Sequence, residues 1–398
     1  MNQFIYLHDQ GDWLAQRWLA AHGAEGPVTL LCEASGRAAA EALRAQHPSV
    51  TAVHALDAAD AAFTPPDPPR VVLPVSCDMV PLRYNPPVQM PDVAPLYPLI
   101  RRLWTAGFRE FELFSLAGSR TLTVPYLLDL FWNRHRGRRC FVVGNGPSLN
   151  AIDMTRLKDE VTLGANRGYL GFADWGFRFT YWGVYDPLQI EAYHGEYEAQ
   201  VPPEIVKFFP FQYLPVLNVA NGCPVFMDWP RAAARQFADT PETLYVGYSV
   251  VYMLLQIAAV MGCDPIVLVG MDHRYHIPRR NRLSRMVRLA GKWVARRYDH
   301  TAWYKAGRAA AREIIKIRAT KELPPSRMWQ ADDAAGPTHF DARYTQERRR
   351  FLMPRPEDAE RDYICAAQWA ETRGVRILNA TPDSALTVFP MVSYDSLF

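Results

Sequence analysis

The stretch that decides the fold spans residues 140–149 and reads CFVVGNGPSL. Its first four residues are apolar, which is typical of a short buried β-strand. Glycine in the turn that follows lets a ligand approach the backbone, and proline presets the backbone of a first helical turn. Amide groups at such a turn, together with a helix dipole, favour phosphate. We therefore expect a nucleotide to be bound by Gly144, Asn145, Gly146, Pro147 and Ser148.

The turn departs from two well-defined phosphate-binding motifs. No Gly-Lys-Ser or Gly-Lys-Thr sequence follows it, so it is not a Walker A loop. Leu149 stands where the third glycine of a dinucleotide-binding fingerprint belongs. A tight turn between a strand and a helix, with no ligand, therefore stays an open alternative.

Further strand signals follow across the second half of the chain. The segment Ser249–Met261 is apolar on nearly every side, which is typical of a buried helix. Strands that alternate with helices pair in parallel through crossover connections. We therefore expect residues 137–398 to form a Rossmann-like α/β domain, a mostly parallel sheet with helices on both faces. The further strands are expected at Glu160–Leu163, Thr180–Tyr185, Ile266–Val269 and Val375–Leu378.

Polar residues follow three of these strands. Asn166 and Arg167 come after the first, Asp186 after the second and Asp272 after the third. In an open parallel sheet, the ligand crevice lies outside the carboxyl ends of the strands. We therefore expect these residues to share one crevice with the glycine turn and to bind the nucleotide. For each of them the alternative is a capping role in a turn, which Asn and Asp commonly take.

Residues 1–136 show a similar alternation and predict a smaller α/β domain that precedes the Rossmann-like one. The basic tract His135–Arg139 is expected to be the linker between them. No constellation of chemically reactive residues stands out in this region. Its strands are expected at Val28–Cys32, Val53–Leu56, Val71–Val75 and Phe111–Ser115, and its helices at Arg37–Gln46, Leu96–Ala106 and Val124–Arg134.

Composition excludes several classes of protein. The 398 residues suit two domains, and 49% hydrophobic with 21% charged residues rules out a disordered or fibrous chain. No apolar run is long enough for a transmembrane helix, and the first residues lack the pattern of a secretory signal. The cysteines are far apart and form no CxxC pair, so neither a zinc site nor a disulfide scaffold is indicated. We expect a reduced, cytoplasmic protein.

His339 lies in the segment GPTHFD, residues 336–341. Histidine has an unperturbed pKa of about 6.5, and a nearby carboxylate can orient its ring for proton transfer. We therefore expect His339 and Asp341 to be catalytic, although a solvated loop histidine is the alternative. Asp332 and Asp333 could instead chelate a divalent metal together with Asp341, but their spacing is not diagnostic.

Charge is distributed unevenly along the chain. The formal net charge is +3, yet residues 274–321 contain a dense cluster of arginine and lysine with only Asp299 and Glu313 as acids. We expect this basic helical insertion to face an anionic membrane surface or a phosphorylated lipid carrier, with peripheral attachment to the inner membrane face. A solvated lid or an oligomer contact is the alternative. Nucleic acid is not an expected partner, because no recognised binding module accompanies the charge.

Several stretches together resemble a known family. CFVVGNGPSLNAIDMTRLKDEVTLGANRGYL, TYWGVYDPL, SVVYMLLQIAAVMGCDPIVLVGMDH, THFDARY and RILNATPDSAL are similar to the MptE-like family, named after 6-hydroxymethylpterin diphosphokinases. Many bacterial members of that family are grouped with motility associated factor glycosyltransferases. The glycine turn and the apolar helix are also similar to bacterial CMP-sialic-acid-dependent sialyltransferases. The resemblance covers residues 140–272 and 330–398, and it does not extend to the first 135 residues.

The resemblance implies roles for individual residues. Asn145, Gly146 and Ser148 would contact the nucleotide phosphate, and Asn166 the nucleotide or the sugar. Ser249 would line the nucleotide pocket, and His339 would be the base that deprotonates the acceptor hydroxyl. Such sialyltransferases use no metal or other cofactor. One departure is Tyr248, which stands where the family has a glycine before the buried helix.

These observations predict a glycosyltransferase. Its donor would be a nucleotide sugar, with a CMP-activated acidic sugar as the leading choice, and its acceptor a surface glycan or a lipid-linked glycan. An alternative is an ATP-dependent pyrophosphokinase acting on a pterin-like alcohol, for which Mg²⁺ would be held by Asp186, Asp272 and Asp341. A non-catalytic scaffold in glycan assembly is a further alternative.

Overall fold

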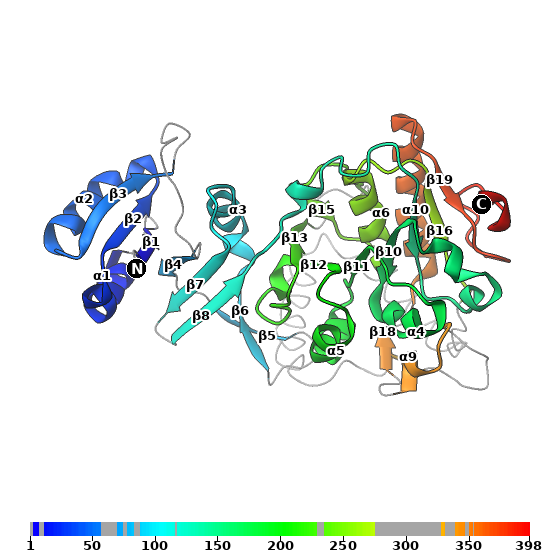
Figure 1. Cartoon of the computed structure of the whole chain (residues 1–398), viewed down its shortest axis with the longest axis horizontal. Helices are drawn as coiled ribbons and strands as arrows, with labels where there is room; N and C mark the ends of the chain where they lie inside the picture. Colours follow the sequence, from blue (N-terminus) through cyan, green and yellow to red (C-terminus); the bar gives the residue numbers. More distant parts are fainter. Residues whose placement is uncertain are drawn as a thin grey trace, which may run out of the picture.

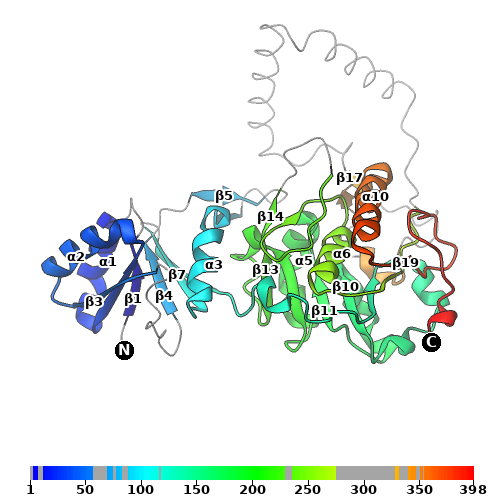
Figure 2. The ribbon, with the colours of Figure 1, turned by 90° about the horizontal axis from the view of Figure 1, so that it is seen from above.

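The computed structural model contains two α/β units, each built around one sheet and lying side by side (Figures 1 and 2). The two ends of the chain lie at opposite ends of the molecule. The structure describes residues 3–7, 12–56, 70–74, 78–82, 88–115, 118–228, 235–274, 328–330, 339–346, 350–352 and 354–398. Most of the basic insertion therefore lies outside the described residues, and so do Asp332 and Asp333.

The first sheet has six strands in the order β3-β2-β1-β4-β7-β8, of which only β8 is antiparallel to its neighbour. Apolar side chains of α1 and α2 cover it in one buried cluster. The strands are β1 (Gln3–Tyr6), β2 (Val28–Cys32), β3 (Val50–Ala55), β4 (Arg70–Pro74), β7 (Glu110–Ser115) and β8 (Gly118–Thr123). The helices are α1 (Asp12–His22), α2 (Arg37–Gln46) and α3 (Tyr97–Thr105), and β5 (Met79–Pro81) pairs with β6 (Gln89–Pro91) outside the sheet.

The second sheet has seven parallel strands in the order β13-β12-β11-β10-β9-β16-β19. Successive side chains of β9 alternate between two cores, with Phe141 and Val143 in one and Cys140 and Val142 in the other. A sheet buried on both faces requires such continuous apolar strands. The strands are β9 (Cys140–Val143), β10 (Val161–Ala165), β11 (Tyr181–Gly183), β12 (Val206–Pro210), β13 (Gly222–Val225), β16 (Ile266–Val269) and β19 (Ile377–Asn379).

Helices cover both faces of the second sheet, as the Rossmann-like interpretation predicts. Apolar residues of α5 belong to the core on one face, whereas those of α6 and α10 belong to the core on the other. The confirmed fold class is therefore α/β, with mostly parallel sheets. The helices are α4 (Phe172–Trp175), α5 (Pro187–Gln200), α6 (Val250–Val260), α9 (Arg343–Gln346) and α10 (Pro356–Arg373), and two short strand pairs join β14 (Met227–Asp228) to β15 (Leu244–Tyr245) and β17 (Met328–Gln330) to β18 (Arg350–Leu352).

The helix predicted over Val124–Arg134 is wrong. The structure has a single 3₁₀ turn at Leu128–Phe131, followed by hydrogen-bonded turns. Asn133 and Gly137 adopt left-handed backbone angles, with φ of 55° and 70°, which end any helical path. The apolar spacing of this segment reflects burial in two different places rather than one face of a helix.

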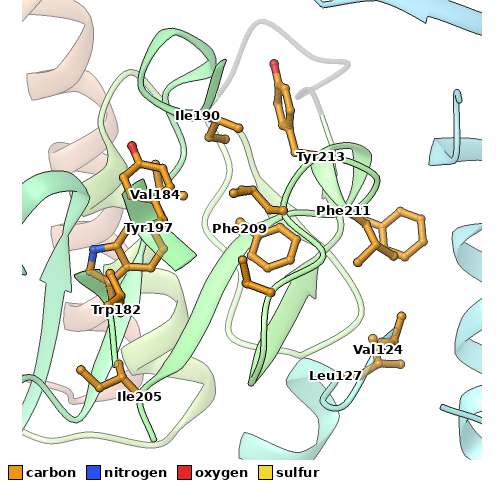
Figure 3. Packing of buried hydrophobic residues seen from close by; sticks show 14 of the residues in the cluster. Val124, Leu127, Trp182, Val184, Ile190, Tyr197, Ile205, Phe209, Phe211 and Tyr213 are labelled. Atoms are coloured by element: carbon orange, nitrogen blue, oxygen red, sulfur yellow. The ribbon is translucent and has the colours of Figure 1, made fainter. Parts of the chain in front are cut away.

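The two units share a continuous apolar core. Val124 and Leu127 of the connection lie beside Phe211 of the second unit (Figure 3), and all three belong to one buried cluster. Tyr97 of α3 stacks on Phe226 with ring centroids 4.6 Å apart. A cavity of about 900 Å³ opens between the units, lined by Tyr97, Arg101 and Phe226 among other residues. Within the part of the chain that the structure describes, no helix combines the length and apolarity needed to cross a bilayer.

Candidate functional site

The second sheet reverses its direction of growth at β9. The chain adds β10 to β13 on one side of this strand and β16 and β19 on the other. Ligands of open α/β sheets bind at such a switch point, outside the carboxyl ends of the strands. Because β11, β10, β9 and β16 are neighbours, the residues that follow them lie along one stretch of this edge. The topology thus brings the turn residues, Asn166, Asp186 and Asp272 to the same edge of the sheet.

Asp272 holds the glycine turn closed against the end of β16. The backbone N–H of Ser148 donates to Asp272 Oδ1 at 3.2 Å, and the Ser148 hydroxyl donates to Oδ2 at 2.6 Å. The N–H of Gly146 donates to the carbonyl of Gly270 at 2.9 Å. The amides expected to bind phosphate are therefore already paired, and a phosphate at Ser148 would compete with a carboxylate of like charge.

The glycines of the turn are required by close packing rather than by unusual backbone angles. Neither Gly144 nor Gly146 adopts a positive φ. A Cβ at either position would overlap atoms near the end of β16, including the carbonyl oxygen of Gly270. The segment after Gly146 is a five-residue 3₁₀ helix, Pro147–Ala151, rather than the α-helix whose dipole was expected to attract an anion. The prediction that the turn binds phosphate thus loses the helix dipole as well as the free amides.

Asn145 and Asn166 bring side-chain amides to the ends of β9 and β10. Asn145 Nδ2 donates to the carbonyl of Ala165 at 3.0 Å, which fixes the orientation of its side chain. Asn166 has a left-handed φ of 47°, and its carbonyl accepts the indole N–H of Trp182. The Oδ1 atoms of both asparagines are buried, and neither has a hydrogen-bond partner among the described residues. Two buried acceptors of this kind favour a ligand that donates hydrogen bonds.

The segment 339–346 docks onto the glycine turn. The N–H of Phe340 donates to the carbonyl of Asn145 at 3.1 Å, and Asn150 Nδ2 donates to the carbonyl of Phe340 at 2.8 Å. The Phe340 ring packs beside Trp175, with centroids 5.0 Å apart. A segment distant in sequence is thereby fixed at the carboxyl edge of the sheet, where Figure 1 places α9 beside α4.

His339 lies within this docked segment. Its ring stacks on Tyr344, with centroids 3.8 Å apart and planes inclined by 10°. Burial lowers the pKa of His339 to about 4, so the ring is neutral at pH 7 and able to accept a proton. Burial also raises the pKa of Tyr344. A side-chain hydrogen bond with Asn166 acts in the opposite direction, and the charge of Asp186 raises the pKa further. His339 is thus linked through Tyr344 to the residues that follow β10 and β11.

Asp341 is paired with Arg343 in this arrangement. Its carboxylate accepts the backbone N–H of Arg343 at 2.7 Å and forms an ion pair with the guanidinium group of the same residue. The hydrogen bond from Arg343 lowers the pKa of Asp341. The pKa of His339, in contrast, is lowered by burial. We therefore infer that Asp341 stabilises the conformation of the docked segment.

Arg167 is buried, with 3% of its side chain exposed. It donates to Glu196 at 2.7 Å and to the carbonyls of Arg343 and Tyr344 at 2.7 and 2.9 Å. Its guanidinium group also lies over the ring of Tyr193. This arrangement anchors the docked segment to the sheet and corrects the expectation that Arg167 contacts a nucleotide directly.

Two of the remaining candidate residues, Asp186 and Ser249, are helix caps. Asp186 caps α5 by accepting the N–H of Leu188 at 2.8 Å, and it lies at the carboxyl end of β11. Ser249 caps α6 by accepting the N–H of Val251 at 3.1 Å. Helix α6 packs on the opposite face of the sheet from α5, so the two caps serve different faces. Asp186 remains near Tyr344, whereas Ser249 is accounted for by the cap.

The carboxylates proposed for magnesium are not arranged as one set of ligands. Asp272 is bonded to Ser148, Asp341 to Arg343, and Asp186 to the start of α5. Across the described residues, no group of three His, Cys, Asp or Glu side chains could hold a metal ion.

Sequence reasoning missed several residues of the site. Tyr344 supports the His339 ring, and Glu196 anchors Arg167. Gln189 places a further buried Oε1 near the start of α5, with no hydrogen-bond partner among the described residues. Only Tyr344 had a signal, because it lies within the stretch THFDARY that carries the family resemblance.

Comparison with known proteins bears on the second unit. Residues 119–278 match the family model described as 6-hydroxymethylpterin diphosphokinase MptE-like, which confirms the resemblance for these residues, less than half of the chain. No curated protein matches the chain. The chain is similar to the structure of MAf glycosyltransferase from Magnetospirillum magneticum AMB-1, with 9% identity and a TM-score of 0.37. The similarity covers 100% of this chain and 58% of that one, and at this score it does not establish a common fold.

Proposed function

We propose that the protein is a transferase that binds a nucleotide-activated sugar at the carboxyl edge of the second sheet and transfers the sugar to a hydroxyl acceptor. The observation that carries this proposal is the pair of buried Oδ1 atoms of Asn145 and Asn166, which have no hydrogen-bond partner among the described residues. The segment that contains the neutral ring of His339 docks at the same edge. Ring amino groups of a nucleobase and hydroxyls of ribose donate hydrogen bonds of the kind that these oxygens require. A CMP-activated acidic sugar is the donor that the family resemblance favours.

The proposed chemistry is a direct displacement. The acceptor oxygen bonds to the anomeric carbon as the bond from that carbon to the donor phosphate breaks, and the acceptor proton passes to a ring nitrogen of His339. General-base catalysis is worth roughly 10²–10⁴ in rate, and a base whose pKa lies far below the working pH gives the smaller values. We expect His339→Ala to lower turnover by about 10²-fold while leaving nucleotide affinity unchanged.

The groups expected to stabilise the departing phosphate are paired in the resting structure. The amides of Gly146 and Ser148 are paired, and Arg167 is held by Glu196. We propose that the resting pairing of Asp272 with Ser148 opens when the donor binds, which frees the amide and hydroxyl of Ser148 for the phosphate. Asp272→Ala would then strengthen CMP binding, because the competing carboxylate is gone.

Thermal stabilisation tests the class of nucleotide. We expect CMP or CDP in the presence of EDTA to raise the melting temperature, because the binding energy adds to the stability of the folded state. Asn145→Ala and Asn166→Ala should each abolish most of this rise. Asn218→Ala, an amide at the junction of the two units, is the matched control and should keep it. Release of CMP from a CMP-linked acidic sugar then measures turnover.

A diphosphokinase is the second candidate, favoured by the description of the matching family model. It requires Mg²⁺ to bridge phosphates. A rise in melting temperature with ATP and Mg²⁺, and none with cytidine nucleotides, would support a diphosphokinase over a glycosyltransferase. A scaffold without catalytic activity would show no shift with any nucleotide.

A further inference from the structure

The connection between the two sheets exposes an unusual set of side chains. Leu130 and Trp132 are 47% and 46% exposed, although both are large and apolar. Arg134, Arg136 and Arg138 follow at alternate positions and are also exposed. We refer to these five residues as the linker surface.

The backbone beneath the linker surface is fixed. The N–H groups of Asn133, His135 and Gly137 donate to the carbonyls of residues 260–262 at the end of α6, at 2.8 to 2.9 Å. The His135 side chain points inward, where a hydrogen bond of 2.8 Å joins its Nε2 to the hydroxyl of Tyr181. Arg136 and Arg138 beside it are exposed, whereas the guanidinium group of Arg134 lies over the Phe131 ring, 5.7 Å from its centroid. Because the backbone is already fixed, binding at this surface requires little ordering of it.

The three arginines carry charge that the described part of the protein does not neutralise. None of them forms an ion pair with a carboxylate of the described residues. Exposed arginines elsewhere do pair, as Arg178 does with Glu204 and Arg373 with Asp239. A preordered surface whose guanidinium groups meet no carboxylate among the described residues is complementary to a dense array of negative charge.

We propose that the linker surface docks the protein onto a bilayer that contains anionic lipid. Arginine contributes attraction to anionic headgroups near the surface, and its long stem lets the charged group reach them. Tryptophan prefers the interface between headgroups and hydrocarbon, and an exposed leucine can enter the same layer. A surface that carries both arginine and large apolar side chains can therefore bind anionic headgroups and enter the interfacial layer.

Other anionic partners fit less well. Nucleic acid would use the three guanidinium groups but would give Leu130 no apolar environment. An acidic protein would need a groove or patch shaped to Trp132, whereas a bilayer surface adapts to the side chains that enter it.

The linker surface lies at the edge of the second sheet opposite the candidate site. It adjoins the end of α6 and the start of β9, whereas the candidate site follows the ends of β9, β10 and β11. Figure 1 shows this connection running along the upper edge, away from α9. Membrane docking therefore leaves the candidate site uncovered, and it does not depend on the function proposed for that site.

Co-sedimentation with vesicles tests the proposal on the full chain. The vesicles contain equal parts of phosphatidylglycerol and phosphatidylcholine, or phosphatidylcholine alone. We expect binding only to the first kind, weakened by salt, with a loss of at least about tenfold in affinity when Arg134→Gln, Arg136→Gln and Arg138→Gln are combined. The control combines Arg17→Gln, Arg37→Gln and Arg44→Gln, which remove the same charge from exposed positions of the first unit and should leave binding unchanged.

Trp132→Ser separates interfacial docking from charge alone. It should weaken vesicle binding several-fold while leaving the dependence on salt unchanged, because it removes no charge. Circular dichroism melting confirms that each variant is folded. Undiminished vesicle binding by the triple linker variant would overturn the proposal, as would equal loss in the control. A reduction in binding to polyglutamate, with binding to vesicles intact, would overturn it as well.

Discussion

Both sheets add strands on either side of their first strand, but they differ in how their strand ends are used. In the first sheet, Glu33 follows β2 and is paired within the protein, since it accepts the hydroxyl of Tyr6 at 2.7 Å and two bonds from Arg102 at 2.6 Å. In the second sheet, Asn145 and Asn166 follow β9 and β10 and keep buried oxygens that no described residue satisfies. Both sheets place polar residues at carboxyl ends. What distinguishes a candidate site is a polar group that the fold leaves unpaired.

The largest expected difference concerns the arginine that each unit places near its strand ends. Arg167→Ala removes a buried guanidinium group, leaves Glu196 without its cationic partner and leaves two carbonyls without a donor, so it should lower the free energy of unfolding by about 3–5 kcal/mol. Arg102→Ala breaks a pair whose side chains are 49% and 25% exposed, and should cost about 0–1 kcal/mol. Urea titration of both variants measures the difference. Equal costs would contradict the distinction between the two sheets.

The next effect concerns pH. The pKa of His339 is about 4 in the folded protein, below its unfolded value, so the unfolded chain binds the additional proton as pH falls. The stability due to the neutral ring is complete above about pH 6.5 and is lost towards pH 4, by at most about 3 kcal/mol.

A comparison of two variants isolates this effect. His339→Gln should flatten the decline in melting temperature across this range, relative to the wild type. His135 and His273 also have pKa values lowered by burial, so some decline should remain. His194→Gln replaces an exposed histidine and should leave the decline unchanged. An identical pH dependence in the wild type and His339→Gln would show that burial of the ring has no cost.

Most strands near the site could be predicted from sequence because a buried parallel strand is a continuous apolar run. Cys140–Val143 and Ile266–Val269 have the predicted bounds. The edge strand at Gly222–Val225 was missed, because glycine and proline interrupt its apolar pattern. The connection at 124–134 was misread because its apolar residues enter the junction between units, a tertiary arrangement that spacing along the chain does not encode.

The strand ends that meet could be predicted, but the pairing of the polar groups there could not. Asp272 follows β16 as expected, yet its carboxylate bonds to Ser148 across the switch point, a contact between residues distant in sequence. The position of His339 depends on Phe340 reaching the carbonyl of Asn145. Topology rules bring residues to one edge, whereas donors and acceptors are matched only by the packing of distant segments.

The smallest effect tests whether packing or a ligand explains the glycines of the turn. A Cβ at Gly146 would overlap Asp272 and lie 2.8 Å from the carbonyl oxygen of Gly270, so Gly146→Ala should destabilise the protein by about 1–3 kcal/mol without any ligand present. Gly195→Ala is the matched control, because nothing lies within 4 Å of a Cβ at this position in α5. In a helix interior alanine is favoured over glycine by about 0.5–1 kcal/mol, so the control should gain stability.

Differential scanning of both glycine variants, with and without CMP, measures their stability and their response to ligand. If Gly146→Ala were as stable as the wild type but no longer responded to CMP, the glycine would serve ligand approach rather than packing. The strand end at β9 would then be open in solution, and the contrast with the paired end of β2 would become sharper.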